Sequence, residues 1–300
     1  MLIFTVLSVL CAIRRLKSGK SDGDSGLSTD HIVNACDELA VHLSMLYSAM
    51  LMHGYFPQVT ARCTIIPIPK GKNGNVTVSQ NYRGISMCSV FAKLYDLIFL
   101  EKFSELLVTS DLQFGFKRHH STTMCSMVLK ETLAYYTVDN GAAFCTFLDA
   151  TKAFDRVDFC KLFRELLKRK IPTIHLRLLL NMYTNSTACI NWNGAFSQSL
   201  GIRNGVKQGG ILSPVLFCIY IDGLLVRLKQ SKIGCWIGNT FVGALAYADD
   251  ITPLAPTPSA MRYMLRICEE YGREFFVSFN AAKSASMYCG KKNLLVFLTV

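Results

Sequence analysis

Tyr247-Ala248-Asp249-Asp250 places two adjacent carboxylates between runs of residues that are typical of β-strands. A further acid lies upstream, where Asp149 follows the apolar, strand-like run 142–148. We therefore predict a hairpin with acids at its tip, facing a strand that ends in a third acid. Carboxylate oxygens are ligands that Mg²⁺ prefers, so the pattern indicates a site for two divalent cations.

This kind of site suits the joining of a nucleotide to a primer end. The attacking 3′-oxygen, the transition state and the leaving pyrophosphate are all anionic, and two cations about 3.5–4 Å apart can stabilise them. An isolated Asp-Asp pair is more often a solvated turn, because short motifs have many false matches. The other motifs of the chain therefore decide how the acids are interpreted.

A glycine-rich loop, residues 204–214, lies between the two acidic positions. Its glycines allow close backbone approach, and Ser213-Pro214 is typical of a helix start. Out of context, such a loop is a plain turn followed by a cap. Beside the acids, Gln208 and Lys207 stand where a base pair and phosphates could be contacted.

Several blocks of the sequence occur together in one known family, and in the same order. The blocks are Arg15-Leu16-Lys17-Ser18-Gly19-Lys20, Ile66-Pro67-Ile68-Pro69-Lys70, Asn81-Tyr82-Arg83-Gly84-Ile85-Ser86, Gln113-Phe114-Gly115-Phe116, the Asp149, Gln208 and Tyr247 blocks, and Phe279-Asn280-Ala281-Ala282-Lys283-Ser284. Over nearly its whole length the chain resembles the reverse transcriptase domain of non-long-terminal-repeat (LINE-like) retrotransposons.

The resemblance implies a metal-binding triad of Asp149, Asp249 and Asp250, with the backbone of Ala150 beside the metals. It implies two Mg²⁺ ions, with Mn²⁺ as an alternative. These residues would catalyse transfer of a nucleotide to the primer.

The resemblance also implies substrate contacts. Phe154 falls at the steric-gate position, where a ring fills the space of a ribose 2′-OH. Lys70 and Arg83 would grip the incoming triphosphate, and Gln208 would lie beside the incoming base pair. Lys283 would act as a general acid near the leaving pyrophosphate.

Each of these residues also has an ordinary structural interpretation. Phe154 could be a core aromatic residue, as most Phe residues are. Lys70, Lys72 and Arg83 could belong to a solvated loop, and Lys283 could be a surface lysine. The acids and the order of the blocks favour the functional interpretation.

The expected fold is α+β, with the fingers and palm of a right-hand polymerase. We expect fingers at about residues 1–140 and 159–197, and a palm at about 141–158 and 198–300. The palm would hold a small antiparallel sheet packed on helices that cover one face. The thumb, endonuclease and zinc knuckle of the family are expected to be absent from these 300 residues.

Hydrophobic periodicity and turn residues predict the individual elements. Helices are expected at the start of the chain and at 31–53, 90–107, 122–138, 161–168, 175–183 and 258–271. Strands are expected at 61–68, 82–85, 188–192, 196–202, 285–289 and 294–298.

Composition is consistent with a polyanionic partner. The formal net charge is +11 and the isoelectric point is near 9.1, which suits nucleic acid or a membrane surface alike.

The twelve cysteines include no Cys-x-x-Cys pair, which favours a reducing compartment. The apolar run Leu2 to Ile13 is shorter than the roughly 20 residues of a membrane span and follows no basic segment. We expect a protein of the cytoplasm and nucleus that is not secreted and has no membrane partner.

The sequence thus predicts an RNA-directed DNA polymerase, a nucleotidyltransferase that uses an RNA template, a DNA primer and dNTPs. The alternative is a truncated, inactive remnant that at most binds nucleic acid. A group II intron-type reverse transcriptase is the second choice among enzymes, and Phe154 disfavours an RNA-templated RNA polymerase. Two positions depart from the family pattern: Gly84 replaces a proline, and Ser25 replaces an acid in the turn 23–26. The oligomeric state stays open.

Overall fold

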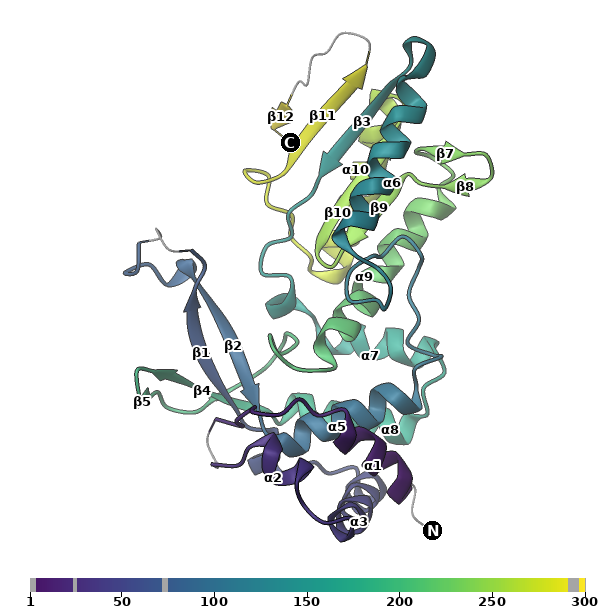
Figure 1. Ribbon diagram of the computed structural model, residues 1–300. Helices are drawn as coiled ribbons and strands as arrows, with labels where there is room; N and C mark the ends of the chain where they lie inside the picture. Colours follow the sequence, from purple (N-terminus) through teal and green to yellow (C-terminus); the bar gives the residue numbers. More distant parts are fainter. Residues whose placement is uncertain (1–3, 24–25, 72–74, 291–296, 300) are drawn as a thin grey trace. The chain divides into compact units, whose positions relative to one another are not determined.

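The computed structural model describes residues 4–23, 26–71, 75–290 and 297–299. The chain forms two compact units, which are described separately (Figure 1). Unit 1 comprises Met1–Leu107 and Leu162–Ser213, and unit 2 comprises Val108–Lys161 and Pro214–Val300. Relative to the predicted fingers and palm, residues 108–140 group with unit 2 and residues 198–213 with unit 1. A compact unit is not a functional subdomain, so the fingers and palm boundaries stay a prediction.

Helices of unit 1 surround an aromatic core. The rings of Phe4, Tyr47, Phe56 and Tyr95 are buried and contact one another edge-on or tilted. Such contacts stabilise a core beyond the burial of apolar area. The helices of this unit are α1 (Val6–Arg14), α2 (Thr29–Val33), α3 (Glu38–His53), α4 (Gln58–Ala61), α5 (Val90–Lys102) and α8 (Thr173–Thr184), together with most of α7 (Phe159–Lys168).

The single helix predicted for residues 31–53 is wrong in one respect, because α2 and α3 are separate helices. Asp37 stands at the N-cap position of α3, where a new helix begins. The predicted end is confirmed, since Gly54 adopts a left-handed φ of 64° and closes α3. The other predicted helices are confirmed with shifts of their ends, the largest at α5, which ends at Lys102 and not at residue 107.

The sheet of unit 1 has the strand order β2-β1-β4-β5, with β6 also paired to β4. Strands β1 and β2 form an antiparallel hairpin, while β1 and β4 are parallel. Gly84 stays in register opposite Pro67, so the departure from the family's proline does not interrupt β2. A Cβ at this glycine would lie 2.9 Å from Ile65 Cγ2, so the glycine leaves space for that side chain. The strands are β1 (Cys63–Pro69), β2 (Tyr82–Cys88), β4 (Thr187–Trp192), β5 (Ala195–Phe196) and β6 (Leu200–Gly201), and η1 (Ser79–Asn81) is a 3₁₀ turn.

Unit 2 contains an antiparallel sheet of order β12-β11-β3-β10-β9. This confirms the small antiparallel sheet predicted for the palm. The strands are β3 (Ala142–Phe147), β9 (Ala244–Tyr247), β10 (Asp250–Ala255), β11 (Ala285–Gly290) and β12 (Phe297–Thr299), and β7 (Trp236–Ile237) pairs separately with β8 (Thr240–Phe241).

Both faces of this sheet carry helices. Cys145 packs in a cluster with residues of α6 (Thr122–Thr137), such as Leu129. The next residue, Thr146, donates a 3.3 Å hydrogen bond to Met261 Sδ of α10 (Pro258–Phe275). Because successive residues of a strand point to opposite faces, α6 and α10 lie on opposite sides (Figure 1). The prediction of helices on one face only is therefore wrong.

Helix α9 (Ser213–Gln230) packs against α10, since the Tyr271 hydroxyl donates a 2.6 Å hydrogen bond to the Tyr220 carbonyl. Among the described residues, no helix is long and apolar enough to cross a membrane. The departure at Ser25 lies outside the described residues.

Candidate active site

The Tyr247-Ala248-Asp249-Asp250 segment is a tight hairpin between β9 and β10. Tyr247 pairs with Asp250, which leaves Ala248 and Asp249 as the two turn residues. Ala248 has a φ of 60°, a left-handed value that costs a residue with a Cβ some strain. A positive φ at the first turn position is typical of the type II′ turn, which matches the twist of a hairpin. The turn presents one carboxylate, and the first residue of β10 presents the next.

Strand β3 brings the third carboxylate to the same end of the sheet. Leu148 and Ile251 form an antiparallel bridge, with N–O distances of 2.9 and 3.3 Å. In antiparallel pairing, the residue after Leu148 lies opposite the residue before Ile251. Asp149 therefore lies opposite Asp250, and Asp249 adjoins them in the turn.

The segment 278–284 supports Asp149 from its other edge. Asn280 N donates to the Asp149 carbonyl at 2.8 Å, and Asp149 N donates to Ser284 Oγ at 3.3 Å. Ala150 forms a bridge with Phe279. Asp149 is thus held by backbone pairing on both edges, while its side chain stays partly exposed.

Lys283 comes from the same supporting segment. Its Nζ lies 3.9 Å from Asp149 Oδ2, and the two side chains are 67% and 38% exposed. An ion pair this open to water contributes little to stability. The ammonium is therefore free to change partners when an anion approaches.

Negative charge is concentrated at this end of the sheet. Partial loss of hydration raises the pKa of Asp250, and the charges of Asp249 and Asp149 raise it further. A bound cation would relieve this repulsion. Among the described residues, no three acidic, Cys or His side chains are already gathered as a complete ligand set. Mg²⁺ does not need one, since it keeps several waters and takes other ligands from substrate phosphates.

Phe154 lies in the 3₁₀ turn η3 (Phe154–Arg156), shortly after Asp149. Its ring stacks on Phe217 of α9, with centroids 4.8 Å apart and an interplanar angle of 15°. Phe116 meets it edge-on at 6.3 Å. Phe154 is only half-buried, whereas Phe217 is fully buried. A fixed ring that stays partly exposed can act as a steric wall, so the core and gate interpretations are compatible.

Two of the predicted site residues lie on the β1–β2 hairpin of unit 1. Arg83 pairs with Ile68, and Lys70 follows Ile68 by two residues, so both basic side chains project from the same face. Both residues are exposed. Lys70 Nζ donates a 2.8 Å hydrogen bond to the Gln80 carbonyl, whereas Arg83 makes no ion pair with any described carboxylate.

The Gln208 loop is anchored against β2 in unit 1. Ser86 N donates a 2.6 Å hydrogen bond to the Gln208 carbonyl. Gly209 has a φ of 104°, and a Cβ there would lie 3.0 Å from the Ser86 carbonyl oxygen. The proposed phosphate contact of Lys207 is wrong, because this residue is buried and its Nζ donates to the Ala61 carbonyl at 3.2 Å.

Gln113 has a place in the site that the sequence did not reveal. Its block belongs to the family pattern, but the resemblance implies no role for this residue. In the structure its side-chain amide is fully buried and bonded to both backbone polar groups of Ala248. The one sequence signal for this contact is Gly115, two residues after Gln113, because a side chain there would lie 2.3 Å from Ala248 N.

Comparison with known proteins agrees with this geometry. Residues 68–298 match the family model described as reverse transcriptase (RNA-dependent DNA polymerase). The chain is similar to the Pol polyprotein of a type-1 R2 retrotransposable element from Popillia japonica, with 28% identity over 93% of this chain and 38% of that protein. It is also similar to the RNA-directed DNA polymerase of the mobile element jockey from Drosophila funebris, with 26% identity over 92% of this chain and 30% of that protein.

Among solved structures, apo telomerase from Candida tropicalis superposes with a TM-score of 0.57. The match covers 87% of this chain and 58% of that one at 14% identity, which shows a shared polymerase fold. The chain spans between a third and two fifths of the R2 protein's length, so it corresponds to one part of such proteins. With the family model matching most of its length and relatives from non-long-terminal-repeat elements, the chain belongs to the reverse transcriptase family.

Proposed function

We propose that this chain adds dNTPs to the 3′-hydroxyl of a DNA primer, using RNA as the template. The observation that carries the proposal is the apposition of Asp149 with Asp250, with Asp249 in the adjoining turn. In the reverse transcriptase family, such a group of carboxylates suits nucleotidyl transfer. The intact triad also argues against an inactive remnant.

The transfer is a substitution at the α-phosphorus of the dNTP. The primer 3′-oxygen forms a bond to that phosphorus, the bond to pyrophosphate breaks, and the 3′-hydroxyl proton leaves to solvent. Two Mg²⁺ ions, or Mn²⁺, held by Asp149, Asp249 and Asp250 beside the Ala150 backbone would stabilise the negative charge on both oxygens. The hairpin contributes fixed carboxylates, so little reorganisation is needed during the step.

Phe154 is proposed to select the sugar. Its ring is fixed by stacking on Phe217 and stays partly exposed. A ribose 2′-OH placed against the exposed part of the ring would clash, while a deoxyribose would fit. This supports DNA synthesis rather than RNA synthesis.

Lys283 is proposed to donate a proton to the leaving pyrophosphate. Its exposed ammonium lies next to Asp149, on the side of the supporting segment. When triphosphate is bound, the ammonium can turn from the carboxylate to the β-phosphate oxygen. The competing role is to neutralise Asp149 without any proton transfer.

Lys70 and Arg83 are proposed to bind the triphosphate, and Gln208 to contact the incoming base pair. Both basic residues project from one exposed face of the β1–β2 hairpin, and an Arg fork suits phosphate oxygens. Gly209 lets the Gln208 loop approach β2 closely. Together with the metal ions, these three residues would contact the dNTP.

Primer extension tests the proposal. The purified chain is mixed with oligo(dT) annealed to poly(rA), dTTP and Mg²⁺, at low salt because phosphate contacts weaken with salt. We expect the primer to be extended, and we expect EDTA to abolish the extension because it removes the metal ions. A folded chain that binds the primer–template yet adds no nucleotide with Mg²⁺ or Mn²⁺ would support the inactive remnant instead.

A further inference from the structure

Gln113 makes a two-sided contact with the acidic turn. Its Oε1 accepts hydrogen bonds from Ala248 N at 2.9 Å and Gly115 N at 2.8 Å, and its Nε2 donates to the Ala248 carbonyl at 3.1 Å. The amide thus satisfies both polar groups of the one turn residue that has a left-handed φ. A fully buried amide with these partners is costly to remove, because the backbone groups would be left unsatisfied.

The backbone around Gln113 reinforces this contact. Residues 112–114 run parallel to β9, with Ala246 N donating to the Leu112 carbonyl at 2.8 Å and Phe114 N donating to the Ala246 carbonyl at 2.7 Å. A Cβ on Gly115 would lie 2.3 Å from Ala248 N, so only glycine permits this approach. The backbone of this segment therefore packs directly against the backbone of the turn.

We propose that Gln113 is a positioning residue that holds Ala248 in its strained conformation and thereby fixes Asp249 for catalysis. The inference deepens the proposed function and rests on it. An unsupported Ala248 would relax toward negative φ, which re-aims the peptide that leads to Asp249. Displacements of about 1 Å in such sites can cost roughly a hundredfold in rate.

The test uses Gln113→Met, which keeps the length of the side chain and removes its hydrogen bonds. We expect kcat to fall roughly 10- to 100-fold and the Mg²⁺ concentration for half-maximal rate to rise, with primer–template affinity unchanged. Gln230→Met makes the same chemical change at an exposed position of α9 and should change neither quantity. Unchanged kcat per folded molecule in Gln113→Met would overturn the proposal.

A second variant separates positioning from mere stability. Glycine adopts a left-handed φ without strain, so Ala248→Gly should restore part of the activity lost in Gln113→Met. If the loss were general destabilisation, the melting temperature would track activity and the glycine would not help.

Hydrogen exchange gives a readout that does not depend on polymerisation. In Gln113→Met, the Ala248 amide should exchange faster, with protection elsewhere in the sheet retained. Faster exchange without any polymerase activity in the parent chain would defeat the proposed function but leave the contact between Gln113 and the turn. Unchanged exchange would refute the positioning role.

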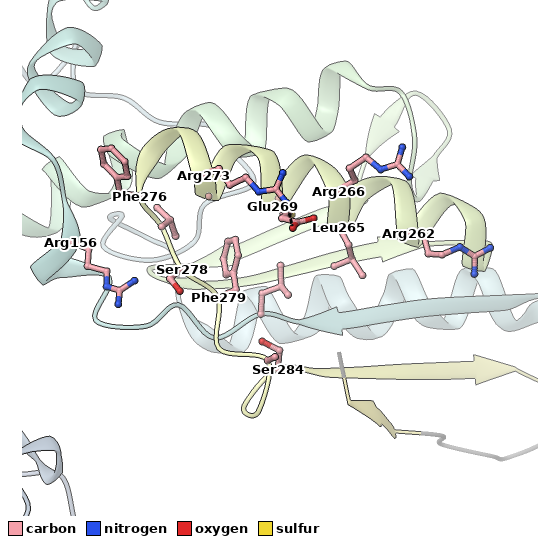
Figure 2. A pocket seen from close by; sticks show the side chains of 15 residues that line it. Arg156, Arg262, Leu265, Arg266, Glu269, Arg273, Phe276, Ser278, Phe279 and Ser284 are labelled. Carbon is pink, nitrogen blue, oxygen red and sulfur yellow. Dashed lines mark hydrogen bonds and ion pairs between the residues drawn. The ribbon is translucent and has the colours of Figure 1, made fainter.

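A hollow of about 850 Å³ lies on the α10 side of unit 2 (Figure 2). Arg262, Arg266 and Arg273 project along one stripe of α10, and Arg156 reaches the hollow from η3. Within the described part of the chain, no carboxylate pairs with Arg156, Arg262 or Arg266, while Arg273 contacts Glu269 at 2.5 Å. Phe276, which is 56% exposed, and Phe279 add aromatic surface.

The spacing indicates the size of the ligand. Arg273 follows Arg262 by eleven positions, which is about 16 Å along a helix. The phosphate chain of one nucleotide would contact only part of this stripe, whereas a polynucleotide strand carries phosphates along its whole length. Exposed rings beside basic groups are typical of sites for unpaired bases. We infer that this arginine groove binds a single-stranded polynucleotide, and the RNA template of the proposed function is the strand to test.

Fluorescence anisotropy with labelled oligo(rU) tests the groove. Arg262→Glu/Arg266→Glu should weaken binding about tenfold or more and reduce the slope of log affinity against log salt by about 1.4, for two phosphate contacts on a single strand. Lys229→Glu/Lys232→Glu gives the same charge change at exposed positions of unit 2 and should have a much smaller effect. If the two double variants weaken oligo(rU) binding equally, or if neither weakens it, the proposed binding by the arginine groove is wrong. Neither result depends on polymerase activity.

Discussion

In unit 2 the carboxylate hairpin is fixed by buried backbone contacts, whereas in unit 1 the β1–β2 hairpin carries Lys70 and Arg83 on an exposed face. The segment 278–284 holds the Asp149 backbone, and Gln113 holds Ala248, the turn residue before Asp249. Arg83 lies on β2, which among the described strands pairs with β1 alone. The difference suggests that metal chemistry needs rigid carboxylates, while triphosphate binding tolerates side chains that adapt to the ligand.

The largest effect is expected at the rigid carboxylates. Asp249→Asn keeps the shape but removes the charge, so nucleotide addition should fall by roughly a thousandfold or more. Single-turnover addition to a preformed primer–template complex measures the loss. Asp139→Asn is the matched control, since Asp139 is exposed and its φ of 53° is one that Asn tolerates. A rate near the parent's in Asp249→Asn would remove this residue from the site.

The steric wall should show a smaller effect, on selectivity rather than rate. Phe154→Ala should lower the preference for dNTPs over rNTPs by about tenfold or more, because the clash with the 2′-OH is lost. The ratio of kcat/KM values for dTTP and UTP measures it. Phe196→Ala, at an exposed ring of unit 1, should leave the ratio unchanged. If Phe154→Ala also leaves it unchanged, the ring is only part of the core.

Substitutions on the exposed β1–β2 hairpin should mainly weaken dNTP binding. Arg83→Ala should raise KM for dNTPs about tenfold with a small change in kcat, since a contact made in both ground and transition states is lost. Lys70→Ala should have a smaller effect, because its ammonium already bonds to the Gln80 carbonyl. Arg14→Ala, on the exposed surface of α1, is the control. If Arg83→Ala lowers kcat and leaves KM unchanged, Arg83 acts in the transition state, as the carboxylates do, and not in dNTP binding.

The smallest effect concerns the buried support of the Gln208 loop. Asp96 of α5 is buried and accepts a 3.3 Å hydrogen bond from Leu212 N. Burial raises its pKa to about 7, although bonds from the loop and the charge of Lys207 oppose the shift. The folded state then binds a proton more tightly than the unfolded state, so Asp96 makes stability fall as pH rises from about 4 to about 7.

Asp96→Asn keeps an acceptor for Leu212 N and removes the titration. Urea unfolding between pH 4 and 8 should show a flatter pH dependence in this variant than in the parent chain. Asp111→Asn, in unit 2, serves as the control. An unchanged pH dependence in Asp96→Asn would mean that Asp96 stays ionised when buried.

The sequence predicted the acidic hairpin because its determinants are local. Adjacent acids after a strand-like run, with a second run following, leave few other arrangements. Residues of the β1–β2 hairpin were predictable for the same reason, since the strand pattern sets which side chains share a face.

Long-range contacts could not be predicted in this way. Lys207 lies next to Gln208 in the sequence, but its burial depends on Ala61, far away along the chain. Gln113 meets Ala248 across 135 positions, and no local pattern reveals that pairing. The second face of the palm sheet was missed because a strand's alternation shows that two faces exist, not what covers each.

Asp149, Asp249 and Asp250 are proposed to bind the catalytic metals together. Anomalous diffraction from crystals of the chain with Mn²⁺, primer–template and a dNTP locates those metals. We expect two peaks about 3.5–4 Å apart, within coordination distance of Asp149 and of the acidic turn. Peaks elsewhere, with the three carboxylates unliganded and the dNTP bound, would contradict it.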